Sequence, residues 1–161
     1  MLRFAVLGHP VAHSLSPAMH AFALESLGLE GSYEAWDTPL EALPGRLKEV
    51  RRAFRGVNLT LPLKEAALAH LDWVSPEAQR IGAVNTVYRD DDGRLVGTNT
   101  DMTGFLEPLA GVLGQSHYFR MARILGTGGA ARAIVRGLAG EGFTLVLAGR
   151  NPSKARALLD E

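Results

Sequence analysis

The segment MARILGTGGAA, residues 121–131, decides the fold class of this chain. Its first five residues predict a short strand, and the apolar spacing of residues 130–138 predicts a helix directly after it. A second strand is predicted over residues 143–148, and Asn151 followed by Pro152 predicts the start of another helix. A strand, a helix and a strand in this order form a parallel β-α-β unit, which is half of a doubly wound, Rossmann-like sheet.

The turn inside this segment has the residue pattern of a nucleotide-binding loop. It consists of Gly126, Thr127, Gly128, Gly129 and Ala130, and it fits G-x-G-x-x-G/A with the next alanine as the last member. Glycines let the backbone approach a pyrophosphate closely, and the first amides of the following helix supply unpaired N–H donors and a positive dipole. We therefore expect a dinucleotide to bind here. The alternative is a tight turn that binds no ligand.

The residues after the second strand of this unit indicate which dinucleotide binds. They are Gly149, Arg150, Asn151, Pro152, Ser153 and Lys154. NAD sites usually place a carboxylate at this point for the ribose 2′-hydroxyl, whereas this segment has two cations and no acid. Arg150 can pair with a 2′-phosphate through two hydrogen bonds, and Lys154 adds a second positive charge. We expect NADP, with Gly149 and Asn151 completing the site. The alternative is that both cations are solvated residues at a helix start.

Residues 1–110 predict a first, larger α/β domain. Strands are predicted over residues 3–7, 33–36, 56–61, 83–88 and 95–98, with a hairpin turn at 90–93 between the last two. Helices are predicted with Ser16 as an N-cap and with a capping box that begins at Thr38. Met19, Phe22 and Leu27 fall on one apolar stripe of the first helix. Strands that alternate with helices indicate a three-layer α/β domain with a mainly parallel sheet.

Pro108 and the glycine-containing segment 111–116 predict a domain boundary, which we place between residues 1–110 and 111–161. A parallel sheet of only two strands has exposed edges and little core. The second unit is therefore expected to be part of a larger domain, and the chain is expected to lack the C-terminal remainder of that domain.

Composition narrows the functional classes. Of the 161 residues, 47% are apolar, which is typical of a globular protein. Lysine plus arginine equals aspartate plus glutamate at 17 each, so no basic bias predicts a nucleic acid or an anionic membrane as partner. The absence of cysteine excludes a disulfide framework and a cysteine nucleophile. It fits a reducing compartment, and with neither a signal peptide nor a membrane span predicted, we expect a cytoplasmic protein.

Polar side chains lie near or after the ends of the predicted strands of the first domain, and Asn85 interrupts one of these strands. They are Ser14, Ser16, Thr60, Lys64, Asn85 and Asp101. Open α/β sheets bind ligands at the carboxyl ends of their strands. Hydroxyl, amide and charged groups gathered there suit a small polyhydroxylated acid. Each residue also has a plainer role as a turn residue, helix cap, buried amide or solvated cation.

The histidines give no metal motif. His9, His13 and His20 are close in sequence, but neither E-x-x-H nor H-E-x-x-H occurs. We expect these histidines to form local hydrogen bonds or to belong to the core. Trp36, Trp73 and the phenylalanines are also expected in the core.

Four motifs in order resemble shikimate dehydrogenases. They are GHPVAHSLSPAMH at 8–20, NLTLPLK at 58–64, GAVNT at 82–86 and NTD at 99–101. Their order and spacing match that family over residues 3–105. The glycine turn and the segment around Arg150 are similar to the NADP domain of the family.

The resemblance implies reversible, NADP-dependent reduction of 3-dehydroshikimate to shikimate, a step of chorismate and aromatic amino acid biosynthesis. By the same resemblance, Ser14 and Ser16 bind the substrate carboxylate. Thr60, Asn85 and Asp101 then contact the ring hydroxyls.

The resemblance also implies that Lys64 and Asp101 are the catalytic pair. A hydride that reaches a ketone carbon builds negative charge on the oxygen. A nearby ammonium group stabilises that charge and donates the proton. Asp101 would orient Lys64 and the reacting hydroxyl.

The chain departs from the family pattern in several ways. Chains of the family are substantially longer, and their missing part supplies the nicotinamide site and late tyrosine and glutamine residues for the substrate. Gly149 stands where asparagine is usual, and Asn151 where threonine is usual. Two alternatives therefore stay open: a truncated, non-catalytic module that binds shikimate or NADP, and a dehydrogenase of quinate or a related hydroxy acid. The sequence does not determine the oligomeric state, and a homodimer is compatible with it.

Overall fold

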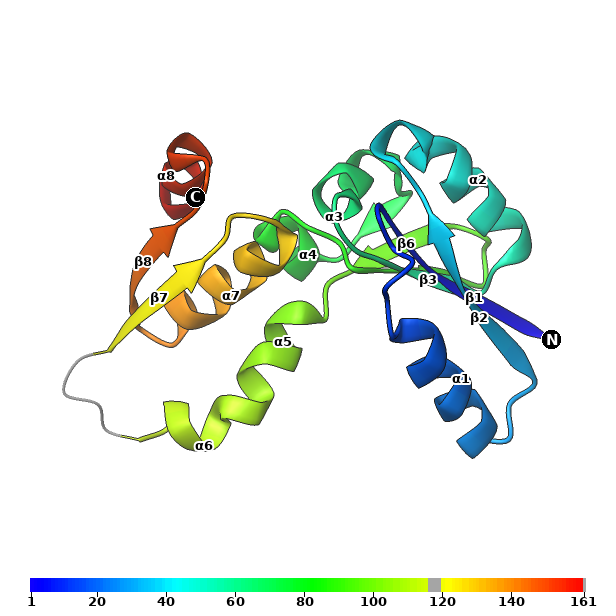
Figure 1. Cartoon of the computed structure of the whole chain (residues 1–161), viewed down its shortest axis with the longest axis horizontal. Coiled ribbons are helices and arrows are strands. Elements are labelled where there is room, and N and C mark those ends of the chain that lie inside the picture. The colour runs from blue at the N-terminus through cyan, green and yellow to red at the C-terminus, as the bar shows by residue number, and fades with distance from the viewer. Residues whose placement is uncertain (116–119, 161) are drawn as a thin grey trace.

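A computed structural model describes residues 1–115 and 120–160 of the protein. Two α/β parts lie side by side and are joined by a run of short helices (Figure 1). We call residues 1–100 the N-terminal part, residues 101–115 the connection and residues 120–160 the C-terminal part. No helix among the described residues combines the length and apolar character needed to cross a membrane.

The N-terminal part contains six strands and several helices, of which three are 3₁₀ or single-turn elements. The strands are β1 (Leu2–Gly8), β2 (Gly31–Asp37), β3 (Gly56–Leu59), β4 (Trp73–Val74), β5 (Thr86–Arg89) and β6 (Leu95–Thr98). The helical elements are α1 (Ser16–Ser26), η1 (Leu40–Ala42), α2 (Leu43–Ala53), α3 (Leu63–Ala66), η2 (Ala67–His70) and α4 (Pro76–Ile81).

The six strands form one mixed sheet with the order β2-β1-β3-β5-β6-β4. The pairs β1–β2, β1–β3 and β4–β6 are parallel, whereas β5 is antiparallel to both β3 and β6. The predicted hairpin is confirmed, because Asp90 accepts hydrogen bonds from the backbone of Asp92 and Arg94, and Gly93 has a φ of 78°. The sheet is therefore mainly parallel, as predicted, with an antiparallel β5 inserted.

The main core lies between this sheet and the helices on one face. Ala5 and Leu7 of β1 point to that face because alternate residues of a strand share a side. Leu43, Leu47 and Val50 of α2 meet them, at the three- and four-residue spacing of a helix. Figure 1 shows α2 and α3 on one side of the sheet and α1 on the other, which gives the predicted three layers.

Several aromatic and apolar residues lie at the surface instead of in the core. The stripe on α1 is exposed: Met19, Phe22 and Leu27 have exposed fractions of 65%, 71% and 70%. Trp73 on the edge strand β4 is 49% exposed. The expectation of a core position was therefore wrong for Phe22 and Trp73, whereas Trp36 packs against the main core.

Both predicted N-caps of the N-terminal part were wrong. Ser16 is the first residue of α1 and makes no cap hydrogen bond; its backbone N–H instead donates to Ser14 Oγ at 3.2 Å. Thr38 is buried and donates to the carbonyl of Trp36 at 2.9 Å, so its hydroxyl is already used before the helix begins. A 3₁₀ turn, η1, precedes α2 instead of a capping box.

The connection consists of α5 (Asp101–Leu106), η3 (Glu107–Leu109) and α6 (Ala110–Leu113). The predicted interruption at Pro108 is confirmed, because this residue lies in the 3₁₀ turn between the two α-helices. The predicted boundary between residues 110 and 111 falls inside α6 and stays a prediction. Ser116, at the end of the predicted boundary segment, lies outside the described residues.

The C-terminal part is the predicted β-α-β unit followed by a helix. It contains β7 (Met121–Leu125), α7 (Gly129–Gly140), β8 (Thr144–Ala148) and α8 (Pro152–Asp160). The strands β7 and β8 pair in parallel as a two-stranded sheet. Helix α7 also packs on α5, where a Cβ on Gly137 would lie only 3.0 Å from Leu106 Cδ1. The connection therefore supplies part of the packing surface of this small unit.

Candidate functional site

The glycine turn joins β7 to α7 and faces the N-terminal part. Gly126 has a φ of 123°, a conformation that glycine adopts without a steric penalty. Its N–H donates to the carbonyl of Ala148 at 2.8 Å, which ties the turn to the end of β8. At Gly129, a Cβ would lie 2.8 Å from Lys64 Cβ, so only glycine permits this approach. The turn and Lys64 are thus in direct contact.

A cavity of about 380 Å³ lies between the two parts. Thr60, Leu61, Pro62, Lys64 and Glu65 of the N-terminal part line one side. Leu125, Gly126, Gly128, Gly129, Ala130, Ala131 and Lys154 of the C-terminal part line the other. Residues that the sequence assigned to a substrate and residues that it assigned to a cofactor therefore line the same cavity from opposite sides.

Lys64 and Asp101 form an ion pair at this junction. The Lys64 Nζ donates to Asp101 Oδ2 at 2.5 Å, and the two side chains are only 16% and 22% exposed. The other carboxylate oxygen, Oδ1, accepts from Asn85 Nδ2 at 2.8 Å. Asp101 is the first residue of α5, and its carboxylate points to these partners instead of capping the helix. Three of the predicted site residues are thus joined by hydrogen bonds.

A chain of polar contacts extends from this pair across the sheet. Asn85 Oδ1 accepts from Thr86 Oγ1 at 2.9 Å, and Thr86 Oγ1 accepts from Asn58 Nδ2 at 3.2 Å. Asn58 Oδ1 accepts from the Tyr33 hydroxyl at 2.7 Å. Burial raises the pKa of Tyr33 to about 12, while a hydrogen bond with Ser16 acts in the opposite direction. The contacts therefore lead from Ser16 to Asn85, which holds Asp101.

Sequence reasoning assigned no role to three members of this chain, which are Tyr33, Asn58 and Thr86. The signal was available for two of them, because Asn58 and Thr86 are polar residues on neighbouring strands among buried apolar ones. They face each other in the antiparallel β3–β5 register. The sequence could not indicate that register, since it depends on which strands become neighbours.

The remaining predicted substrate residues occupy two places. Thr60 lies in the cavity wall directly after β3. Ser14 and Ser16 are half-buried at the start of α1 and bond each other locally. Among the described residues, these two serines lie outside the wall of the cavity that Lys64 lines.

The predicted cofactor residues after β8 surround the start of α8. Asn151 Oδ1 accepts from the Lys154 N–H at 3.0 Å, so the predicted cap of this helix is confirmed. Arg150 is exposed in the turn. A Cβ on Gly149 would lie 2.9 Å from Thr127 Cγ2, which explains why glycine fits between the two turns. The ammonium group of Lys154 contacts Glu65 at 3.0 Å, a partner that the sequence did not suggest.

Two of the three clustered histidines form hydrogen bonds, and His13 is exposed. His9 Nδ1 lies 3.0 Å from the Asp37 carboxylate, and His20 Nδ1 lies 2.9 Å from the carbonyl oxygen of Ser16. His20 also stacks on Tyr33, with 4.1 Å between the ring centroids. In residues 1–115 and 120–160, no three histidine or acidic side chains come together in a way that could hold a metal ion.

Sequence comparison identifies relatives along the whole chain. The chain is 72% identical over 161 residues to a shikimate dehydrogenase (NADP(+)) of Thermus thermophilus, covering all of this chain and 60% of the relative. It is 45% identical over 161 residues to one of Methylobacterium radiotolerans, covering 97% of this chain and 57% of the relative. The chain therefore spans about 60% of the length of these relatives.

Solved structures are similar in fold as well. The chain matches a shikimate 5-dehydrogenase from Thermus thermophilus in complex with NADP(H) and shikimate, at 71% identity and a TM-score of 0.87. It also matches shikimate dehydrogenase from Aquifex aeolicus, at 35% identity and a TM-score of 0.91. In both cases the match covers 99% of this chain and 60% of the solved chain.

The N-terminal part carries the signature of a family. The profile of the shikimate dehydrogenase substrate binding domain matches residues 6–87, just over half of the chain. This range includes the end of β1, all of β3 and the cavity residues Thr60 and Lys64. The chain therefore belongs to the shikimate dehydrogenase substrate-binding domain family.

Proposed function

We propose that this protein acts in the NADP-dependent, reversible reduction of 3-dehydroshikimate to shikimate. The observation that carries the proposal is the Lys64–Asp101 ion pair, which lies beside the glycine turn in one cavity. The names of the relatives in Thermus and Methylobacterium support the same reaction. The chain spans about 60% of the length of those relatives. The activity is therefore a proposal for this chain, and the residues described above support it.

Lys64 is proposed as the proton donor and acceptor. NADPH, when bound, supplies the hydride for the ketone carbon. The Lys64 ammonium group donates a hydrogen bond to the ketone oxygen, stabilises the negative charge that develops there and gives up a proton. In the reverse direction, Lys64 accepts the proton from the hydroxyl group. Asp101 holds the ammonium group in place, and Asn85 fixes the carboxylate through its second oxygen.

The other polar residues are proposed to bind the substrate. Ser14 and Ser16 would hold its carboxylate, and Thr60, Asn85 and Asp101 would contact its ring hydroxyls. Support comes from Thr60 in the cavity wall and from the chain of contacts between Ser16 and Asn85.

The glycine turn fits the diphosphate of a dinucleotide. Gly126, Gly128 and Gly129 line the cavity, and α7 is a full helix whose first amides lack partners within the helix. Arg150, Asn151 and Lys154 would hold the 2′-phosphate of NADP, with Thr127, Ala130 and Gly149 beside them.

Three further properties belong to this proposal. The first is a division into a substrate-binding domain, residues 1–110, and part of an NADP domain, residues 111–161. The second is a cytoplasmic location. The third is a homodimer, which sedimentation equilibrium of the purified chain would test.

Calorimetric titration with shikimate tests the substrate site first. The parent chain is expected to bind at one site, and Lys64→Ala is expected to retain most of that binding while turnover is lost. Lys48→Ala, at an exposed position of α2, is the matched control and should change neither. Binding of quinate in preference to shikimate would favour the related dehydrogenase. Shikimate binding without turnover in the parent would indicate a binding module, and equal turnover by Lys64→Ala and the parent would remove Lys64 from the mechanism.

Arg150→Ala tests the cofactor assignment. The variant is expected to weaken NADP binding far more than NAD binding, since only NADP carries the 2′-phosphate. Arg156→Ala, at an exposed position of α8, is the control. An NADP to NAD affinity ratio that Arg150→Ala leaves unchanged would contradict the proposed role.

A further inference from the structure

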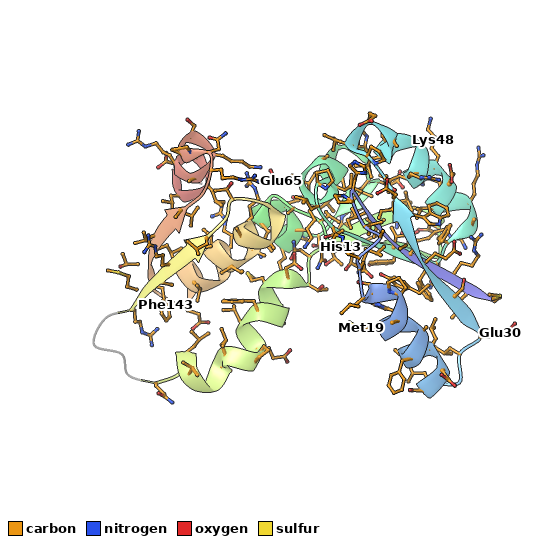
Figure 2. All side chains as sticks on the ribbon, viewed as in Figure 1. His13, Met19, Glu30, Lys48, Glu65 and Phe143 are labelled. Atoms are coloured by element: carbon orange, nitrogen blue, oxygen red, sulfur yellow. The ribbon has the colours of Figure 1, made fainter. Side chains whose placement is uncertain are left out.

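Glu65 lies where the two parts of the molecule meet, and the proposed reaction gives it no role. It follows Lys64 in α3 and lines the same cavity. Figure 2 shows it beside the elements of the C-terminal part. An acidic side chain is unexpected at this position, because a carboxylate repels the phosphates that the glycine turn is proposed to bind.

One carboxylate joins α3 to both helices of the C-terminal part. Lys154 Nζ of α8 donates to Glu65 Oε1 at 3.0 Å. Arg132 Nε of α7 lies 3.6 Å from Glu65 Oε2. Glu65 therefore faces two cations that come from the C-terminal part.

The two cations differ in how firmly they are held. The Arg132 side chain is 14% exposed, and its guanidinium packs over Gly82 at the end of α4, where a Cβ would lie 2.9 Å from Nη1. The Lys154 side chain is 41% exposed and has a long flexible stem. Lys154 can thus leave Glu65 at little steric cost, whereas Arg132 remains packed.

We propose that Glu65 is a positioning residue that competes with the 2′-phosphate of NADP for Lys154. This inference rests on the proposed function, which places that phosphate near Arg150 and Lys154. A 2′-phosphate that contacts Lys154 must share the ammonium charge with the Glu65 carboxylate or displace that carboxylate. A nucleotide without the 2′-phosphate leaves the Glu65–Lys154 pair intact. Glu65 therefore reduces the preference for NADP over NAD, and Arg132 remains as its partner after the exchange.

Glu65→Gln tests the competition, since the amide keeps the shape and removes the charge. The probes are adenosine 2′,5′-bisphosphate and adenosine 5′-monophosphate, titrated into the whole 161-residue chain by calorimetry. Their affinity ratio isolates the 2′-phosphate. We expect Glu65→Gln to raise the ratio in favour of the bisphosphate by about two- to fivefold, the range expected for a partly exposed ion pair. High salt is expected to reduce the gain.

Two variants make this test specific. Glu49→Gln removes a carboxylate from an exposed ion pair with Arg46 on α2 and should leave the ratio unchanged. In a Lys154→Met background, Glu65→Gln should no longer raise the ratio, because the shared lysine is gone. A gain that persists without Lys154 would overturn the competition and indicate general charge repulsion.

The outcomes separate this inference from the proposed function. If the parent prefers the bisphosphate and Glu65→Gln leaves that preference unchanged or lowers it, the role of Glu65 is overturned and the proposed cofactor site stands. If the parent shows no preference for the bisphosphate, the proposed 2′-phosphate site is overturned, and the competition is overturned with it.

Discussion

The N-terminal and C-terminal parts are both α/β units, but they differ in how many apolar residues they bury. The N-terminal sheet has six strands and a cluster of 15 buried core residues among the described residues. The C-terminal sheet has two strands and a cluster of five. The smaller cluster is completed by half-buried residues such as Phe105 and Leu106 of the connection. The C-terminal part thus depends on α5 for packing that its own sheet does not provide.

This difference matters for the candidate site because each part supplies a different kind of group. The N-terminal part, together with Asp101 of the connection, supplies charged and amide side chains held by hydrogen bonds, as in the Lys64–Asp101–Asn85 cluster. The C-terminal part supplies backbone at a glycine turn and cations on α7 and α8. The more deeply packed part therefore carries the proposed proton chemistry, and the less packed part carries the proposed anion binding.

The same substitution in both cores gives the largest expected effect. Leu43→Ala, at a fully buried position of the N-terminal core, is expected to cost about 4 kcal/mol of unfolding free energy, because rigid neighbours prevent the cavity from closing. Leu138→Ala, in the C-terminal core, is expected to cost about 2 kcal/mol, since its half-buried neighbours can relax. Urea denaturation followed by circular dichroism measures both. A larger loss for Leu138→Ala than for Leu43→Ala would contradict the expected difference between the two cores.

The dependence of the C-terminal part on α5 predicts the next largest effect. Gly137→Leu is expected to lower the free energy of unfolding by about 1–3 kcal/mol, because the added side chain would meet Leu106 and Met102. Gly140→Leu is the matched control on the same helix: a Cβ there meets nothing within 4 Å. We expect the control to gain up to about 1 kcal/mol from helix propensity. Equal thermal stability of the two variants would show that the α5–α7 contact does not support this part.

The N-cap of α8 is expected to stabilise one end of the C-terminal part. Asn151→Ala removes the acceptor for the Lys154 N–H and is expected to lower the free energy of unfolding by about 1 kcal/mol. Hydrogen exchange of the α8 amides should accelerate, while that of β1 and β3 should not. Asn151→Ser retains a capping oxygen and should restore most of the protection. Acceleration throughout the N-terminal sheet would mean that the two parts open as one unit.

The smallest effect concerns acid stability in the N-terminal part. The hydrogen bond from Arg51 lowers the pKa of Asp72 below its ordinary value of 3.8, and the Leu95 N–H adds to this shift. A lowered folded-state pKa means that the contribution is present above pH 3.8 and is lost as the pH falls below it. After allowance for solvent screening at this exposed pair, Asp72→Asn should cost about 0.5 kcal/mol at pH 7 and less at pH 3. A loss that is independent of pH would show that the charge of Asp72 does not contribute to stability.

Local patterns predicted the elements that depend on neighbouring residues in the sequence. The hairpin at Asp90–Gly93, the glycine turn and the Asn151 cap were all predicted, because a few adjacent residues determine each. The Ser16 cap was wrong because α1 already begins at this residue, and the Thr38 cap was wrong because the Thr38 hydroxyl donates to the carbonyl of Trp36. Short-range signals therefore fail where neighbouring residues offer a second local arrangement of the same groups.

Long-range partners escaped prediction even where the residues themselves had been singled out. Lys64, Asn85 and Asp101 were assigned to one site, but the contact of Asn85 with the second oxygen of Asp101 was not foreseen. Lys154 was assigned to a phosphate, whereas it contacts Glu65, 89 positions away in the chain. The exposed Phe22 of α1 shows the same limit for apolar residues, because spacing defines a stripe but not what lies opposite it.

The sequence by itself determined that this protein is an α/β chain with a glycine turn and a set of polar residues after its strands. These features follow from periodicity, glycine conformations and residue chemistry within a few positions. Only the tertiary structure decided that the turn lies against Lys64, that β5 pairs antiparallel with β3, and that Glu65 joins α3 to α7 and α8. The physical reason is that such contacts depend on packing between segments far apart in the chain, and that packing is set by the whole core.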